Sequence, residues 1–202
     1  TNDKGRNFRL VRAPLLDPAP RNWKQVLPHR KGVMLEDVDL FKGFWVATER
    51  DDGVLRLRVT EFATGEHHYI DMPEAVYSTG PGTNEEFATG TFRFVYTSYV
   101  TPRTVYDYEV AKRAKTLLKQ QPVLGGYKPE EYDSALLMAT AGDGTRVPVS
   151  LVWKKSLRGT GPRPLLLYGY GSYGHPMDVN FRSSRLSLLD RGMVFAIAHV
   201  RG

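Results

Sequence analysis

The first half of the chain alternates apolar and polar residues with a period of two, as half-buried β-strands do. In Val54–Val59 arginines alternate with apolar residues, and the run follows the apolar segment Gly43–Thr48 across an Asp-Asp-Gly turn at residues 51–53. A Thr-Gly turn at residues 64–65 leads into the next short run, His67–Ile70. Such turns between alternating runs are typical of β-hairpins. Because no long apolar stripe with helical spacing is present here, the sequence predicts an all-β first half.

The same half contains a weak internal repeat with a period of about 48 residues. Shifted by that distance, Phe44-Trp45-Val46 falls on Phe92-Arg93-Phe94, and Glu61 falls on Glu109. A period in the forties built of short strands is typical of a β-propeller blade. The alternative is a piece of a β-sandwich whose hairpins match by chance. Two blades and part of a third cannot close a propeller, so the propeller interpretation predicts that the chain is a fragment.

The pattern changes after the Gly-Gly pair at residues 125–126. Two strand-like runs around a Gly-Asp-Gly turn predict a hairpin, and Pro148 inside the second run predicts that this strand lies at a sheet edge. The run Leu165–Tyr168 is apolar throughout and predicts a strand buried on both faces. A helix at Phe181–Asp190 and another buried strand at Met193–Ala198 are expected to follow. This order predicts the beginning of a mixed α/β sheet, which is incomplete because one helix cannot cover both faces.

Composition excludes several classes of protein. The 202 residues contain 41% hydrophobic residues and no cysteine, which excludes disulfides, thiolate metal sites and a cysteine nucleophile. No apolar run approaches the roughly 18 residues of a membrane-spanning helix. The net charge of +6 comes from scattered basic residues, so nucleic-acid binding is not indicated, and no histidine pair has metal-ligand spacing. The absence of an export signal predicts a cytoplasmic protein, with the periplasm as the alternative.

The candidate chemistry lies in the glycine-rich segment Gly169–Gly174, which follows an apolar run. It matches G-x-G-x-x-G by letter, but the bulky Tyr170 and Tyr173 do not fit a dinucleotide-binding turn. Ser172 lacks the glycine two positions earlier that a nucleophile elbow has. The segment is either a tight turn at the end of a strand or, as in α/β-hydrolases, a loop that supplies a donor to an oxyanion hole. In the second case the Tyr170 hydroxyl would stabilise the oxyanion.

This glycine-rich segment, the segment Ser184–Gly192 and the C-terminal His199-Val200-Arg201-Gly202 resemble the prolyl oligopeptidase family of serine peptidases. Within that family the chain is most similar to the oligopeptidase B group, which the segments Thr1–Phe8 and Thr101–Thr104 also resemble. The resemblance covers essentially the whole chain, and its most specific part is the run from Tyr168 to Gly174.

The resemblance implies a two-domain enzyme of which this chain holds a part. Residues 1–124 would form the C-terminal blades of a seven-bladed β-propeller, and residues 125–202 the N-terminal part of an α/β-hydrolase peptidase domain. The family's catalytic Ser, Asp and His are expected beyond Gly202, so this chain alone is expected to be inactive. The complete enzyme would cleave short basic peptides after Arg or Lys, without a cofactor, a metal, nucleic acid or a membrane as partner.

The resemblance also implies roles for three residues. Tyr170 matches a tyrosine that stabilises the tetrahedral oxyanion, in agreement with the reasoning from the residues themselves. Tyr173 matches an aromatic position at the substrate pocket. Asp178 matches a position where acidic residues face basic substrate side chains, and the second acid of that pattern is replaced here by Asn180. Two alternatives stay open, a non-catalytic propeller-type binding module and a carboxylesterase on the same hydrolase scaffold.

Overall fold

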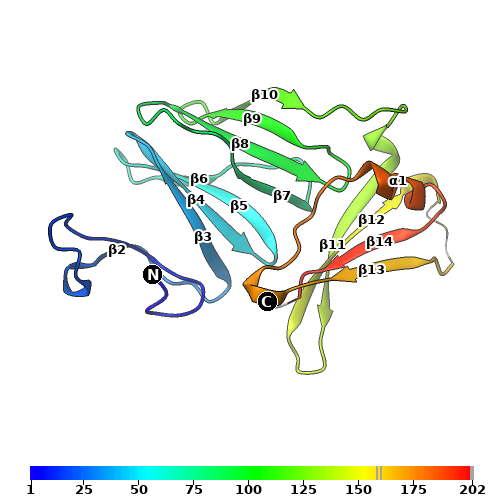
Figure 1. Ribbon diagram of the computed structural model, residues 1–202, viewed down its shortest axis with the longest axis horizontal. Coiled ribbons are helices and arrows are strands. Elements are labelled where there is room, and N and C mark those ends of the chain that lie inside the picture. Colours follow the sequence, from blue (N-terminus) through cyan, green and yellow to red (C-terminus); the bar gives the residue numbers. More distant parts are fainter. Residues whose placement is uncertain (158, 160, 201–202) are drawn as a thin grey trace. The chain divides into compact units, whose positions relative to one another are not determined.

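The computed structural model describes residues 1–157, 159 and 161–200 (Figure 1). The chain divides into two compact units, Thr1–Ile70 with Glu86–Thr89 and Asp71–Glu85 with Gly90–Gly202. Strands dominate both units. In the described part of the chain, no helix is long and apolar enough to cross a membrane.

The first unit contains a four-stranded antiparallel sheet in which each strand pairs with the next one along the chain. Its strands are β3 (Val33–Leu40), β4 (Phe44–Asp51), β5 (Val54–Glu61) and β6 (His67–Tyr69). Asp52 and Gly53 connect β4 to β5 and both have positive φ, as a two-residue type I′ hairpin requires. A two-stranded ladder precedes this sheet, with β1 (Leu10–Arg12), the 3₁₀ helix η1 (Pro20–Asn22) and β2 (Lys24–Leu27).

The second unit begins with a matching antiparallel sheet, again paired in chain order. Its strands are β7 (Tyr77–Pro81), β8 (Thr91–Ser98), β9 (Thr104–Glu109) and β10 (Ala114–Gln120). The alternation in β8 buries every second side chain, including Phe92, Phe94 and Tyr96. The predicted repeat is confirmed as two four-stranded antiparallel sheets, each paired in chain order. The predicted alignment of Phe44 with Phe92 is one residue off, because Phe44 pairs with Glu61, whereas Phe92 pairs with Tyr108 and its neighbour Thr91 pairs with Glu109.

The rest of the second unit forms a mixed sheet with the strand order β11-β12-β14-β13. Its strands are β11 (Tyr132–Thr140), β12 (Arg146–Lys154), β13 (Leu165–Gly169) and β14 (Val194–Ala198), with the helix α1 (Ser183–Leu189). Short 3₁₀ helices lie at η2 (Pro129–Glu131), η3 (Lys155–Leu157) and η4 (Ser172–Gly174). β13 and β14 are parallel, and α1, which connects them, packs against β14 and β12. The predicted order of hairpin, strand, helix and strand is confirmed, although α1 is shorter at both ends than predicted.

Two local predictions about this sheet are wrong. β13 is not buried on both faces, because within the described chain it is an edge strand paired only with β14, and Leu166 and Leu167 are 43% and 57% exposed. β12 is not an edge strand, because β11 and β14 flank it. Pro148 is accommodated since it lies just outside the stretch Val149–Val152 that pairs with β14, and its carbonyl accepts the His199 N–H at 2.9 Å.

Within the second unit, the β7–β10 sheet and the mixed sheet share one hydrophobic core. Tyr99, just after β8, packs with side chains of β12, β14 and α1, namely Val152, Ile197 and Leu189. Burying a side chain of this size contributes about 1.5–3 kcal/mol. The core therefore holds the strands β12 and β14 firmly in place next to the loop that follows β13.

Candidate functional site

Tyr170 is the first residue after β13, at the carboxyl end of a strand that runs parallel to β14. Its side chain is 43% exposed, and its hydroxyl has no hydrogen-bond partner among the described residues. Gly169 pairs with Ala198, and a Cβ at Gly169 would come within 3.8 Å of the Ala198 carbonyl oxygen. In open α/β sheets, ligands bind beyond the carboxyl ends of parallel strands. The phenol therefore lies where such a sheet binds ligands, with its O–H available to donate.

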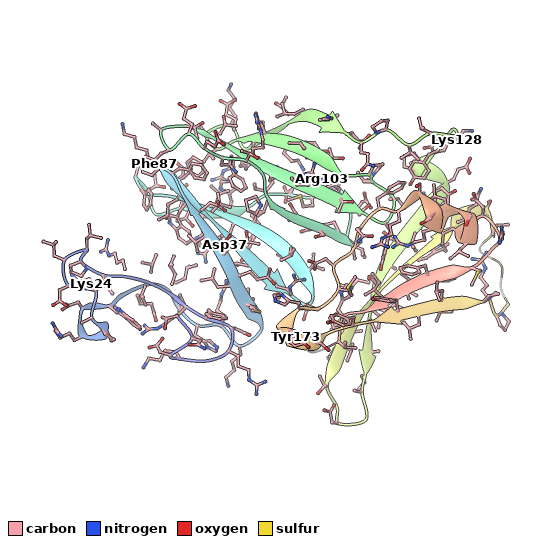
Figure 2. All side chains as sticks on the ribbon, viewed as in Figure 1. Lys24, Asp37, Phe87, Arg103, Lys128 and Tyr173 are labelled. Atoms are coloured by element: carbon pink, nitrogen blue, oxygen red, sulfur yellow. The ribbon has the colours of Figure 1, made fainter. Side chains whose placement is uncertain are left out.

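The loop after Tyr170 folds back on itself. The Met177 N–H donates to the Tyr170 carbonyl at 3.3 Å, and the His175 N–H donates to the Ser172 carbonyl at 3.2 Å. Tyr173, within η4, has a φ of 60°, which costs a non-glycine residue about 1 kcal/mol or more. Its side chain is 91% exposed, and Figure 2 shows it in the turn beyond β13. An aromatic ring held in solvent by an unfavourable backbone is a candidate binding group.

Asp178 follows this loop and is half-buried. Asn180, two residues later, forms hydrogen bonds within the protein. The Asn180 Oδ1 accepts a hydrogen bond from Nε of Arg182 at 3.3 Å and a longer one from Nη2 of Arg185 at 3.5 Å. The Asn180 carbonyl accepts a hydrogen bond from Nη1 of Arg185 at 2.7 Å. Asn180 therefore forms hydrogen bonds with two arginines, Arg182 just before α1 and Arg185 within it.

Arg185 is an unusually buried cation, with 8% of its surface exposed. Its guanidinium carbon lies 4.1 Å from the ring centroid of Phe195 and 5.0 Å from that of Tyr99. Burial lowers the pKa of Arg185, while the nearby Tyr99 acts to raise it, and a guanidinium stays charged in either case. The two ring contacts and the hydrogen bonds to Asn180 compensate for the lost hydration and fasten α1 to the sheet.

A hydrogen-bonded cluster that sequence reasoning missed lies beside the loop. Oγ of Ser150, on β12, is 2.8 Å from Nε2 of His199 and 2.7 Å from the hydroxyl of Tyr99. Nδ1 of His199 is 2.8 Å from the carbonyl oxygen of Met177. This is not a nucleophile with its base, because Ser150 is fully buried, out of reach of a substrate, and Nδ1 of the ring meets a carbonyl where a triad has a carboxylate.

An open pocket of about 270 Å³ lies between α1 and the strands β13 and β14. Leu166, Tyr168, Arg185 and Phe195 are among its lining residues, and Tyr170 is not. Met177, whose N–H donates to the Tyr170 carbonyl, also lines the pocket, so the pocket adjoins the returning limb of the loop. Within the ranges that the structure describes, no group of three His, Asp or Glu side chains is placed to hold a metal ion.

The two repeated four-stranded sheets define the class of the first part of the chain. A family model described as "Prolyl oligopeptidase, N-terminal beta-propeller domain" matches residues 1–121. The chain belongs to the prolyl oligopeptidase family of serine peptidases, and its repeated sheets are part of a β-propeller domain. The β-sandwich alternative is therefore excluded. The predicted domain boundary between residues 124 and 125 stays a prediction.

Curated relatives and solved structures agree with this assignment. The chain is 42% identical over 201 residues to dipeptidyl aminopeptidase BI of Pseudoxanthomonas mexicana, covering 99% of this chain and 28% of that protein. It is 32% identical over 202 residues to protease 2 of Moraxella lacunata, covering 100% of this chain and 29% of that protein. Oligopeptidase B from Trypanosoma brucei, in a closed form with covalently bound antipain, superposes with a TM-score of 0.88 at 32% identity, covering 99% of this chain and 29% of that chain. The chain thus spans less than a third of the length of these relatives.

Proposed function

We propose that the protein to which this chain belongs is a serine endopeptidase that hydrolyses short peptides after Arg or Lys. The observation that carries the proposal is the Tyr170 phenol, half-exposed at the carboxyl end of a parallel strand in a member of the prolyl oligopeptidase family. When a nucleophile attacks a peptide carbonyl, negative charge develops on the oxygen. A positioned O–H donor stabilises that charge and typically contributes about 3–4 kcal/mol to the transition state.

In this proposal the mixed sheet β11–β14 is the beginning of an α/β-hydrolase domain, and the repeated sheets are blades of a seven-bladed propeller. The order of hairpin, strand, helix and parallel strand supports the first assignment. The nucleophilic Ser, its His base and the Asp that orients the His would lie outside this chain, which covers 28% and 29% of two of its relatives. The propeller would admit short unfolded peptides and exclude folded proteins.

The proposed chemistry is acyl transfer to water. The Ser hydroxyl attacks the scissile carbonyl and loses its proton to the His, and the Tyr170 O–H, together with a backbone N–H, holds the resulting oxyanion. The His then protonates the leaving amine, and a water molecule releases the acyl group by the same route. Tyr173 would contact the substrate with its ring, and the Asp178 carboxylate would attract its basic side chains.

A second candidate is the release of dipeptides from the free N-terminus of a peptide. The observation that favours it is the 42% identity to a protein named dipeptidyl aminopeptidase, which exceeds the 32% identity to protease 2. The two candidates share the nucleophile and the oxyanion donor. They differ in whether the substrate's terminal ammonium group is recognised.

A panel of peptides tests both candidates on the full-length protein. The endopeptidase proposal predicts that an N-terminally blocked peptide is cleaved after Arg or Lys and that its matched Pro or Ala variant is a poor substrate. Cleavage confined to unblocked dipeptide amides would favour the second candidate. Hydrolysis of esters but not of amides would indicate an esterase, and hydrolysis of no peptide or ester would indicate a binding module and overturn both proposals.

A further inference from the structure

The cluster around His199 touches the same backbone that carries Tyr170. His199 follows β14 directly, and its Nδ1 contacts the Met177 carbonyl at 2.8 Å. The N–H of that same residue, Met177, donates to the Tyr170 carbonyl at 3.3 Å. Two successive hydrogen bonds therefore lead from the imidazole ring to the backbone of the phenol.

The other side of the ring is anchored in the core. Nε2 of His199 is 2.8 Å from Oγ of Ser150, which also lies 2.7 Å from the Tyr99 hydroxyl. Ser150 and Tyr99 are 0% and 1% exposed, so neither hydrogen bond competes with bulk water. Ser150 is fixed by strand pairing on both sides, with Leu136 on β11 and with Ile197 on β14.

The hydrogen-bond partner of Nδ1 determines that this nitrogen of His199 is protonated. A carbonyl oxygen can only accept, so Nδ1 of His199 carries a proton that it donates to Met177. Ser150 Oγ lies within hydrogen-bond distance of Nε2, of the Tyr99 hydroxyl and, at 3.5 Å, of the Ile197 carbonyl oxygen, so the ring has a partner at each of its two nitrogens. Burial raises the pKa of Tyr99 to about 12, so this phenol keeps its proton and stays a donor at neutral pH.

We propose that His199 is a positioning residue for Tyr170, and that its imidazole clamps the returning limb of the loop at Met177 to the rigid end of β14. The inference rests on the proposed function, because it assigns to the ring the task of aiming the oxyanion donor. Without the clamp, the Met177 carbonyl loses its partner, and the returning limb is held by the packing of Met177 and Val179 against the core and by the Met177 N–H bond to Tyr170. A displacement of about 1 Å in a catalytic group costs up to about 100-fold in rate.

Two substitutions of His199 separate the two sides of the ring. In His199→Asn the side-chain amide nitrogen takes the place of Nδ1 and still donates to Met177, whereas the contact with Ser150 is lost. In His199→Gln the amide takes the place of Nε2, so it reaches Ser150 and no longer reaches Met177. A positioning role through Met177 predicts that His199→Asn keeps most of the activity. His199→Gln is expected to lower kcat by roughly 10-fold or more, with little change in KM.

The measurements use the full-length protein with a blocked Arg peptide, and the exposed His67 provides matched controls. His67→Asn and His67→Gln should leave kcat, KM and the melting temperature unchanged. A double-mutant cycle with Tyr170→Phe measures whether the effect of His199 on kcat depends on the Tyr170 hydroxyl, which a merely structural role would not require. Because His199 acts through Tyr170, His199→Gln should lower kcat no further once the phenol is absent.

Hydrogen exchange tests the clamp independently of activity. Amide exchange in the 170–177 segment should accelerate in His199→Gln and stay near the wild-type rate in His199→Asn. Unchanged exchange in His199→Gln, or additive losses of kcat in the double-mutant cycle, would overturn the inference and leave the proposed function standing. A Tyr170→Phe variant with unchanged kcat would instead remove Tyr170 from the proposed function, and the exchange result would then still decide whether the clamp exists. If His199→Gln does not fold, His199→Ala provides the second test, since loss of the Nδ1 donor to the Met177 carbonyl should also accelerate exchange in the same segment.

Discussion

The Ser150 hydroxyl and the His199 imidazole, 49 residues apart in sequence, meet at 2.8 Å in the interior of the second unit. The contact resembles the Ser–His pair of a catalytic triad, but its two residues lie in a different environment. Ser150 is sealed in the core, and the ring turns its other nitrogen to the Met177 carbonyl. Its geometry suits a structural clamp, which connects the core to the loop that presents Tyr170.

Removing the Ser150 hydroxyl should destabilise the protein. Ser150→Ala removes the hydroxyl that contacts Nε2 of His199 and the Tyr99 hydroxyl, and it leaves the Tyr99 O–H with the longer contact to the carbonyl oxygen of residue 150, at 3.4 Å. An unsatisfied buried polar group costs about 1–3 kcal/mol, so chemical denaturation of the full-length protein should show a loss in that range. Ser187→Ala on the exposed side of α1 is the control and should change stability by less than about 0.5 kcal/mol. Equal stability of Ser150→Ala and wild type would show that the cluster contributes nothing to stability.

The Asp190 carboxylate should stabilise the protein in a pH-dependent way. A hydrogen bond from Lys154 at 2.9 Å, supported by one from Tyr132 at 2.7 Å, lowers the pKa of Asp190 below its ordinary value of 3.8. A lowered carboxyl pKa contributes stability that is present above pH 3.8 and is lost as the pH falls through the folded value. Asp190→Asn should therefore lower the melting temperature at pH 7, and the difference should begin to shrink near pH 4 and disappear only below the lowered pKa of the folded state.

The exposed Asp52, in the turn between β4 and β5, provides the control for Asp190. Asn tolerates the positive φ of this position, so Asp52→Asn should melt like the wild type at both pH values. A difference between Asp190→Asn and wild type that persisted in acid would mean that the ion pair is not its cause.

Restoring the second acid of the expected substrate-binding pattern should not improve binding of dibasic substrates. Oδ1 of Asn180 faces Arg182 and Arg185, so an aspartate there would pair with these two guanidinium groups. Asn180→Asp should raise the melting temperature, because it supplies a partner to the buried cation, and leave KM for dibasic peptides unchanged. A lower KM would show that position 180 reaches the substrate after all.

Substituting the exposed Tyr173 should affect substrate binding without affecting the stability of the fold. Its side chain is 91% exposed, so Tyr173→Ala should change the free energy of unfolding by less than about 0.5 kcal/mol. If the ring contacts substrate, KM for a blocked Arg peptide should rise while the melting temperature stays constant. An unchanged KM would remove Tyr173 from the candidate site.

The parts of the fold with strict periodicity could be predicted from the sequence. Alternation and the Asp-Gly turn located β4 and β5, because side chains of a strand with one buried face must alternate. The run Leu165–Tyr168 predicted a strand but not its exposure, since exposure depends on which neighbours cover it. Similarly, a proline predicts a missing N–H donor but not which stretch of the strand is paired, so Pro148 gave the wrong position for β12.

The candidate site was predictable only in part. The glycines around Tyr170 mark a turn after a strand, and the structure places the phenol there, half-exposed. The cluster of Ser150 and His199 was not predictable, because its residues come from distant strands and one ring nitrogen binds a backbone carbonyl, which leaves no sequence motif. The sequence signals for this cluster were a serine within one apolar strand and a histidine directly after a second apolar strand.

The most direct test of the account is the kcat of Tyr170→Phe in the full-length protein. Tyr168→Phe, two residues earlier on β13 and 45% exposed, is the matched control for loss of a tyrosine hydroxyl. We predict that Tyr170→Phe lowers kcat for a blocked Arg peptide by about 100-fold or more with KM little changed, while Tyr168→Phe keeps wild-type kcat. A Tyr170→Phe enzyme with the kcat of the wild type would contradict the assignment of this hydroxyl to the oxyanion.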